Sequence, residues 1–380
     1  MNFKTTEEQQ MARDAVREFA QKEIAPVARE YDEAEKFPHK QIEGLAQLGL
    51  LGMIIPEEYG GAGFDSVSYA LALEEIAKAD ASVAVIVSVT NSVCCYPILS
   101  FGTEEQKQKY LVPLARGEKL GAFCLSEPQA GSDAAGLKTS AVEDGDFFVL
   151  NGTKSWVTNG SEAEVFIVMA VTGEKEGKKQ ITSFIIEGGT EGFTVSSHEH
   201  KMGQRASQTN EMSLVDVRVP KANVLGEIGS GIRVAFGSLD NGRIGIAALS
   251  NGIAQAALEE STKYAKERIA FGKSIAEFQA IQFKLADMAM QTEAARLLTL
   301  RAAAAKDANS KQTGIYASQA KLFASENANK VCAEAIQIHG GNGYSRHYNV
   351  EKYYRDARIT TIYEGTSEIQ KIVISRGILR

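Results

Sequence analysis

The sequence predicts an α+β protein with an N-terminal helical domain, a middle β-sheet domain of barrel-like form and a C-terminal antiparallel four-helix bundle. Residues 1–118 carry apolar side chains at helical spacing, whereas residues 119–229 carry alternating or β-branched runs between turn signals. Residues 230–380 are helical again and rich in alanine. No helix interrupts the middle segment, which excludes the strand–helix alternation of a Rossmann fold.

The composition is that of a globular protein with an acidic balance. The 380 residues are 44% hydrophobic and carry a net charge of −7, with lysine and arginine scattered along the chain. This distribution lacks the basic footprint of a nucleic-acid-binding protein. Cys94, Cys95, Cys124 and Cys332 show no disulfide framework and no CxxC spacing, which fits a reducing compartment.

The N-terminus has no apolar core like that of a signal peptide and is too acidic for a transit peptide. We therefore expect a cytoplasmic protein, or one of the mitochondrial matrix if the chain is a mature form. His198 and His200 would share one face of a strand, but no third ligand lies near them in the sequence. We accordingly expect no metal site.

The N-terminal domain is predicted to be a succession of helices. The first begins after Thr5 or Thr6, and others follow at about 39–50, 66–79, 81–100 and 103–116. Residues 81–103 carry no charge and are long enough to span a bilayer. Serine, threonine, asparagine and proline interrupt this run, so we predict a buried core helix and no membrane insertion.

In the middle domain the strand signals lie at 147–150, 165–172, 181–186 and 212–219. Asp144-Gly145 and Asn151-Gly152 are dipeptides typical of two-residue hairpin turns, and we expect a turn at each. These strands, with no helix between them, predict a β domain.

The C-terminal domain is predicted to contain long helices at about 230–266, 279–306 and 313–338, which suits an antiparallel bundle. Residues 267–274 end like a phosphate-binding loop, but Glu267 stands where that motif requires its first glycine. Gly340, Gly341 and Gly343 follow a helix, so they do not form a dinucleotide fingerprint. They mark either a helix C-terminus or the neighbourhood of a ligand.

Residues 362–370, IYEGTSEIQ, place one carboxylate, that of Glu364, between apolar neighbours and a glycine. Partial desolvation by these neighbours predicts a raised pKa, in the working range of a general base. Gly365 permits close approach of another molecule. Ser367 and Gln370 fit a capping box that begins a helix, so the alternative is a glutamate that serves only that helix N-terminus.

Two segments of the middle domain concentrate hydrogen-bonding groups. Residues 123–133, FCLSEPQAGSD, are rich in hydroxyl and backbone donors, and residues 155–160, SWVTNG, hold the only tryptophan. A planar aromatic ring beside hydroxyl groups suits a flat heteroaromatic ligand. Trp156 is otherwise explained as a core residue.

Together these segments resemble the acyl-CoA dehydrogenases. FCLSEPQAGSD, SWVTNG, LDNGRIGIAA, ERIAFGK, QIHGGNGY and IYEGTSEIQ occur in the order and spacing of that family, over essentially the whole chain. The short-chain, butyryl-CoA branch is the most similar. The resemblance implies an FAD-dependent conversion of a short- to medium-chain acyl-CoA to the trans-2-enoyl-CoA, with electrons passed to an electron-transferring flavoprotein. It also implies a homotetramer.

The resemblance assigns roles residue by residue. Glu364 corresponds to the base that removes the α-proton while the β-hydrogen leaves as hydride to the flavin. FAD contacts correspond to Phe123, Cys124, Leu125, Ser126, Trp156, Val157, Thr158, Arg268, Phe271, Gln279, Gln337, Ile338, His339, Gly340, Gly341, Thr366 and Glu368. In this family the contact matching residues 337–341 often comes from across a subunit interface. Acyl-CoA contacts correspond to Ser132, Asp240, Arg243, Tyr363 and Gly365.

Some members of the family carry the base at the position that Gly242 occupies here, and a glycine cannot act as one. This pattern disfavours the isovaleryl- and long-chain-specific members. Residues 81–103 offer no cation for a terminal carboxylate, so a dicarboxylic acyl group is disfavoured as well.

Two alternatives remain open at this point. An acyl-CoA oxidase would use O₂ directly, although the compact length favours the dehydrogenase. A non-catalytic relative that binds DNA would require a basic C-terminal face, and the acidic balance together with an intact Glu364 argues against it.

Overall fold

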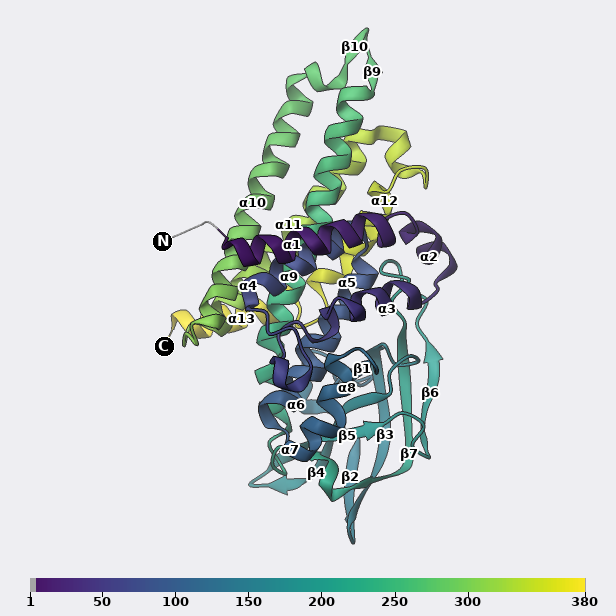
Figure 1. Ribbon diagram of the computed structural model, residues 1–380, viewed down its shortest axis with the longest axis vertical. Helices are drawn as coiled ribbons and strands as arrows, with labels where there is room; N and C mark the ends of the chain where they lie inside the picture. Colours follow the sequence, from purple (N-terminus) through teal and green to yellow (C-terminus); the bar gives the residue numbers. More distant parts are fainter. Residues whose placement is uncertain (1–4, 380) are drawn as a thin grey trace.

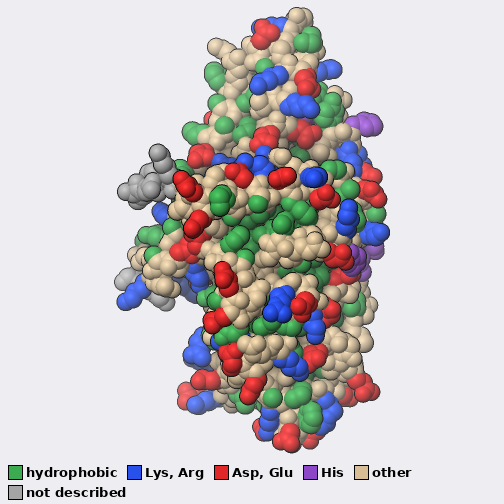
Figure 2. All heavy atoms as spheres, in the orientation of Figure 1, with side chains coloured by type: hydrophobic (Ala, Val, Ile, Leu, Met, Phe, Trp, Pro, Cys, Tyr) green, Lys and Arg blue, Asp and Glu red, His purple; other side chains and the backbone are tan. Residues whose placement is uncertain are grey.

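The computed structural model describes residues 5–379, which form a helical region, a β region and an elongated helical bundle (Figure 1). The bundle extends away from the β region, and the N-terminal helices lie across the junction between the two. On the face shown in Figure 2, acidic and basic side chains are interspersed, and no basic patch gathers there.

The N-terminal region contains eight α-helices within the described residues. They are α1 (Glu7–Phe19), α2 (Ala28–Ala34), α3 (His39–Gln47), α4 (Ser66–Ala79), α5 (Ala81–Val89), α6 (Tyr96–Phe101), α7 (Glu104–Gln106) and α8 (Val112–Ala115). Thr6 caps α1 in a capping box with Gln9, as predicted. Helix α4 has the predicted bounds, 66–79.

The uncharged segment forms α5 and α6, joined by the π-helical residues Thr90–Cys95. Ala81–Phe101 is long and apolar enough to cross a membrane, yet 89% of its most apolar window is buried inside the chain. Its surroundings are those of a core helix, as the sequence predicts. Cys94, Cys95, Cys124 and Cys332 are all free thiols and all buried.

The β region consists of β1 (Gly121–Cys124), β2 (Ser140–Asp144), β3 (Phe147–Thr158), β4 (Val165–Lys175), β5 (Lys178–Glu187), β6 (Phe193–His198), β7 (Thr209–Pro220) and β8 (Val224–Leu225). The order is β6-β7-β3-β2-β4-β5-β8, with β1 parallel to β4. Phe148 of β3 packs edge-to-face on Phe184 of β5, and Phe166 of β4 does the same with Phe193 of β6. Strands far apart in the sheet order thus face each other across one core, so the sheet curls over on itself.

One of the two predicted hairpin turns is wrong. Gly145, with φ +59°, makes the turn between β2 and β3 as expected. Asn151-Gly152 lies instead inside β3, at a break in the pairing register with β7. A Cβ atom at position 152 would lie 2.5 Å from Thr139 Oγ1, so this glycine serves the close approach of a neighbouring segment.

The C-terminal region contains the long helices α9 (Gly231–Glu267), α10 (Gln279–Asp307) and α11 (Thr313–His339) and the shorter α12 (Val350–Arg358) and α13 (Ser367–Ile378). The long helices agree with the prediction to within one residue at each end. A small hairpin of β9 (Ile269–Ala270) and β10 (Lys273–Ser274) connects α9 to α10. Helices α4, α10 and α11 all pack on α9, while α12 and α13 pack on α11.

A buried ionic network joins the three regions. Lys352 on α12 donates to Asp356 at 2.7 Å and lies 3.5 Å from Asp80, which precedes α5. The other oxygen of Asp356 accepts from the backbone N–H of Gln204, in the β region. Each of these side chains is at most 4% exposed. The carboxylates of Asp80 and Asp356 therefore depend on one cation.

Lys352→Met is expected to lower the free energy of unfolding by about 3–5 kcal/mol, because it leaves two buried carboxylates without a cation. The shift of the urea-unfolding midpoint measures it. Lys221→Met, which removes an exposed partner of Glu143, is the control and should change stability by less than about 1 kcal/mol. Equal effects of the two changes would contradict the assigned role of Lys352.

Candidate active site

Glu364 lies in a tight turn between the 3₁₀ turn Ile359–Thr361 and α13. Its φ is +55° and that of Gly365 is +92°, so a non-glycine residue adopts the left-handed region. Interior donors hold this turn. Gln370 Nε2 donates to the carbonyls of Glu364 at 3.2 Å and of Gly365 at 2.9 Å, and Lys321 Nζ donates to the Gly365 carbonyl at 2.7 Å. A strained conformation persists where surrounding contacts determine it in this way.

The predicted capping box at Ser367 is wrong. Helix α13 begins at Ser367 with Thr366 as its N-cap, and Thr366 Oγ1 accepts from the Ile369 N–H. Gln370, the other half of the predicted box, points back to the turn at Glu364. Because the turn requires that amide group, the cap moves one residue earlier.

The carboxylate of Glu364 lies between α9 and α11 without a hydrogen-bond partner for one of its oxygens. Glu364 Oε2 is shielded from solvent, and no side chain or backbone group of residues 5–379 bonds to it. A Cβ atom at Gly242 on α9 would lie only 2.3 Å from that oxygen. The glycine thus leaves the space that the carboxylate occupies.

Burial raises the pKa of Glu364 to about 7, although nearby Arg243 and Lys321 act to lower it. Arg243, on α9, is 8% exposed and donates to Asp240 at 2.9 Å. Its Nε is buried without a partner among the described residues. A carboxyl group with this pKa can take up and release a proton near neutral pH.

A second glycine of α9, Gly245, allows two side chains to approach the helix closely. A Cβ atom at Gly245 would lie 2.5 Å from Ser88 Oγ and 2.7 Å from Tyr69 Oη, which are themselves 3.2 Å apart. The pKa of Tyr69 is raised by burial and by the charge of Glu364, so the phenol stays neutral and lies within the field of that carboxylate.

In the β region the two hydrogen-bonding segments are fastened to each other. The Glu127 carboxylate accepts from Lys154 Nζ at 2.7 Å and from the N–H groups of Lys138 and Thr139. Burial would raise the pKa of Glu127, but these bonds prevail and hold it at about 2. The Ser155 N–H donates to the Ser126 carbonyl at 2.9 Å. Loop 123–133 and strand residues 155–160 therefore form one fixed surface.

Trp156 projects from that surface. Its φ is +61° at a bulge in β3, and its side chain is 59% exposed, so it is not a core residue. The predicted cofactor residues Ser126 and Thr158 are partly exposed, and so are Phe123 and Leu125. The side chains of Cys124 and Val157 are 0% exposed, which leaves only their backbone groups for a ligand.

Another set of predicted cofactor residues lies at the far end of the bundle. Arg268, Phe271 and Gln279 lie in and beside the β9–β10 hairpin, at the opposite end of the molecule from the β region (Figure 1). Phe271 is 95% exposed. A single chain does not bring this hairpin to Trp156.

The C-terminal end of α11 holds the third set. Gln337, Gly340 and Gly341 are exposed, while Ile338 and His339 are buried. The His339 ring stacks on Tyr264 with centroids 4.1 Å apart, and burial lowers the pKa of its imidazole. His339 can therefore offer a ligand little beyond its backbone.

Of the remaining residues predicted to bind cofactor or substrate, some are exposed and others make hydrogen bonds within the protein. Ser132 and Glu368 are exposed, and Thr366 serves as the cap of α13. The Tyr363 hydroxyl accepts from Gln204 Nε2 at 3.1 Å, which connects the residue before Glu364 to the buried network of Asp356.

Sequence reasoning missed Lys321, Glu127 and Lys154. All three are buried charges, and a single charged residue gives no periodic signal that would distinguish it from an exposed one. It also missed Glu35, which joins His198 and His200 so that one potential ligand atom of each lies within 4.8 Å of the others. Arg205 already donates to the Glu35 carboxylate, and His200 bonds to its second oxygen at 2.7 Å.

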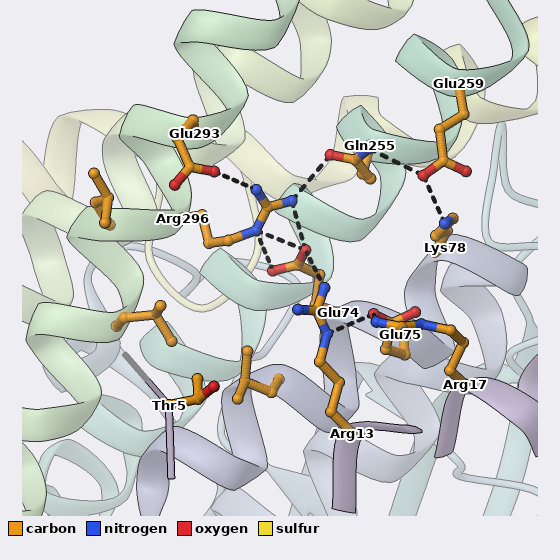
Figure 3. A pocket seen from close by; sticks show the side chains of 13 residues that line it. Thr5, Arg13, Arg17, Glu74, Glu75, Lys78, Gln255, Glu259, Glu293 and Arg296 are labelled. Carbon is orange, nitrogen blue, oxygen red and sulfur yellow. Dashed lines mark hydrogen bonds and ion pairs between the residues drawn. The ribbon is translucent and has the colours of Figure 1, made fainter. Parts of the chain in front are cut away.

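A cleft of about 650 Å³ opens between α1, α4, α9 and α10, away from Glu364 (Figure 3). Charged side chains line it, and they pair with one another. Arg13 and Arg17 bind Glu75 at 2.7 and 2.9 Å, while Arg296 binds Glu74 at 2.7 Å. Balanced pairs of this kind join the N-terminal region to the bundle and leave no group poised for chemistry.

Three family models match successive parts of the chain. The acyl-CoA dehydrogenase N-terminal domain matches residues 6–118, the middle domain residues 122–217 and the C-terminal domain residues 229–379. The chain belongs to the acyl-CoA dehydrogenase family. Members of this family are flavoproteins, and acyl-CoA dehydrogenation is the reaction of the chain.

Similar proteins match over the full length. The mitochondrial short-chain specific acyl-CoA dehydrogenase of Mus musculus is 50% identical over 374 residues, which are 98% of this chain and 90% of that protein. Butyryl-CoA dehydrogenase of Megasphaera elsdenii, 47% identical, superposes with a TM-score of 0.98 and both chains fully covered. The same values hold for a chain from work on the electron transferring flavoprotein of Acidaminococcus fermentans.

Gly242→Ala is expected to lower kcat by about a hundredfold, because a methyl group there would displace the carboxylate of Glu364. Gly237→Ala, also on α9, is the matched control, since its Cβ would meet Phe101 at an ordinary 3.4 Å. Steady-state rates of acyl-CoA dehydrogenation compare the two. Full activity of Gly242→Ala would show that the carboxylate works from another position.

Proposed function

We propose that this chain is an FAD-dependent dehydrogenase of short acyl-CoA thioesters in which Glu364 is the catalytic base. The observation that carries the proposal is the buried, unpartnered Oε2 of Glu364 together with a pKa of about 7. An oxygen without a hydrogen-bond partner is free to accept the α-proton of a thioester. Glu364 then holds that proton as a neutral carboxyl group.

The backbone of the same turn supports the charge that develops. No described residue accepts a hydrogen bond from the Glu364 N–H, while Lys321 and Gln370 occupy the turn's carbonyls. This N–H can donate to the thioester oxygen as the α-carbon loses its proton. Arg243 and Asp240, on α9, would bind the thioester neighbourhood, and exposed Ser132 would meet the CoA portion.

The residues present fit FAD. An exposed indole held in a fixed orientation by the Glu127–Lys154 pair suits one face of a flat ring, with Ser126 and Thr158 as hydrogen-bonding partners. When bound, FAD supplies the acceptor for the β-hydride. Thr366 and Glu368 would meet the cofactor beside the base.

The separation of the cofactor residues within one chain favours a homo-oligomer. Arg268, Phe271 and Gln279, with the exposed residues of 337–341, would hold the diphosphate and adenosine parts of a cofactor bound to a neighbouring subunit. An apolar stripe supports such an assembly: Phe283, Met290 and Leu297 on α10 are spaced by seven residues and are 64%, 58% and 41% exposed. We propose a homotetramer.

A short, uncharged acyl chain suits the space beside Glu364. Tyr69 on α4 and Ser88 on α5 lie close against α9 at Gly245 and would limit the length of the acyl chain. The helix that carries Ser88 has no lysine or arginine to bind a terminal carboxylate. The similarity to butyryl-CoA and short-chain dehydrogenases supports the same substrate class.

We propose an electron-transferring flavoprotein as the electron acceptor and a cytoplasmic location, or the mitochondrial matrix for a mature form. The likeness to a chain from structural work on such a flavoprotein supports the first point. The burial of the one membrane-length apolar helix found among the described residues argues against membrane insertion.

Glu364→Gln is expected to keep a folded, yellow protein and to lose at least about 10²-fold in kcat, because the amide cannot accept the α-proton. Flavin absorbance and steady-state rates measure the two properties. Glu18→Gln changes an exposed glutamate on α1 and serves as the control. Substantial turnover by Glu364→Gln would assign the base elsewhere.

The wild-type protein is expected to turn over butyryl-CoA faster than longer or dicarboxylic acyl-CoAs, with dye reduction and without stoichiometric peroxide. Rates against acyl length with an artificial electron acceptor, and a peroxide assay in air, test this. Peroxide equal to product would identify an oxidase. A preference for a dicarboxylic substrate would contradict the uncharged acyl site.

A further inference from the structure

We infer that Lys321 is a positioning residue for the base: its buried ammonium holds the left-handed turn that presents Glu364 and places a positive charge beside that carboxylate. The inference rests on the proposed role of Glu364. Lys321 lies near the middle of α11, a helix far from Glu364 in the sequence, and is 0% exposed.

The geometry shows what this ammonium does. Lys321 Nζ has three donors, and its hydrogen bond among the described residues goes to the Gly365 carbonyl at 2.7 Å. That carbonyl belongs to the residue directly after the base, whose own φ is +55°. Gln370 donates to the same carbonyl from α13, so donors from two helices hold it. Without them the turn would relax toward the conformations that a glutamate prefers.

The charge of Lys321 is not consumed by an ion pair with another side chain in the described part of the chain. The groups that act on Lys321 are Glu364, Arg243, Glu368 and Glu326. Glu368 and Glu326 are exposed, so solvent screens their charges. The positive charge of Lys321 therefore acts mainly on the carboxylate of Glu364. Burial lowers the pKa of Lys321 to about 8, so the ammonium stays charged at neutral pH.

The pKa of Glu364 is set by a balance between burial and the charged groups on the surrounding elements. Arg243 on α9 and Lys321 on α11 favour the ionised carboxylate, whereas burial favours the neutral acid. Tyr69 on α4, Cys94 after α5 and the adjacent Tyr363 carry raised pKa values and stay neutral near pH 7. Two cations therefore oppose the desolvation of one carboxylate, and Lys321 is the one that also contacts its turn.

The experiment compares Lys321→Gln, which keeps a donor but removes the charge, with Lys321→Met, which removes both. Only ionised Glu364 accepts a proton, so kcat/KM of the wild type should rise with pH through about 7. Both variants should move this acid limb upward by about one pH unit. Lys321→Met should also lose about ten- to a hundredfold in kcat with little change in KM.

A second measurement does not depend on turnover. The ¹³C signal of the Glu364 carboxyl group, assigned by its absence in Glu364→Gln, gives the pKa of the base directly in each folded variant. Lys371→Met is the matched control, because this exposed lysine pairs with Glu326 at 3.8 Å and does not touch the turn. It should titrate and react like the wild type.

An upward shift of the carboxyl titration in Lys321→Gln, absent from Lys371→Met, would support the inference. Unchanged titration and pH profile, with only a lower unfolding temperature, would overturn it and leave Lys321 a structural residue. Failure of the proposed function is separate: it would appear as undiminished activity in Glu364→Gln, whatever the Lys321 variants show.

Discussion

The placement of one carboxylate, with an oxygen shielded from solvent and without a hydrogen-bond partner among the described residues, constrains the residues around it. Glu364 needs space against a helix, a backbone conformation that glutamate seldom adopts, and enough positive charge to ionise near neutral pH. Gly242 provides the space, Gln370 and Lys321 fix the conformation, and Arg243 with Lys321 provides the charge. These groups come from α9, α11 and α13, so the bundle must be assembled before the site exists. Stability and chemistry share the same contacts here.

The β region contributes rigidity of another kind. The pair of Glu127 and Lys154 is buried, and breaking such a pair is far more damaging than its net contribution suggests. Its position between the loop before β2 and the strand that carries Trp156 explains why it is there. The backbone of Trp156, with φ +61°, would not keep this conformation without such support, and the indole would then lose its fixed orientation. Charge burial is used to fix an exposed aromatic surface.

Much of this could be read from the sequence, and the failures have physical causes. Helix α4 and the long C-terminal helices follow from apolar spacing, and Gly145 makes its turn as expected. Asn151-Gly152 has the residue types of a hairpin turn. The prediction failed because the dipeptide carries no information on the segment packed beside it. The cap of α13 is Thr366 because the Gln370 amide bonds to the carbonyls of the preceding turn and not to a residue at the N-cap. The distance between the β9–β10 hairpin and Trp156 depends on how the three regions pack together. The local pattern of the sequence carries no information on that packing.

The closeness of Gly242 on α9 to the Glu364 carboxylate means that two separate stretches of chain reach the same point in space. A side chain at 242 would enter from regular helix, whereas Glu364 enters from a strained loop. A carboxylate could therefore change its position in the sequence while keeping its position between the helices. Relocation of this kind would release the loop from its unusual backbone and would transfer the carboxylate to a long, regular helix of the bundle.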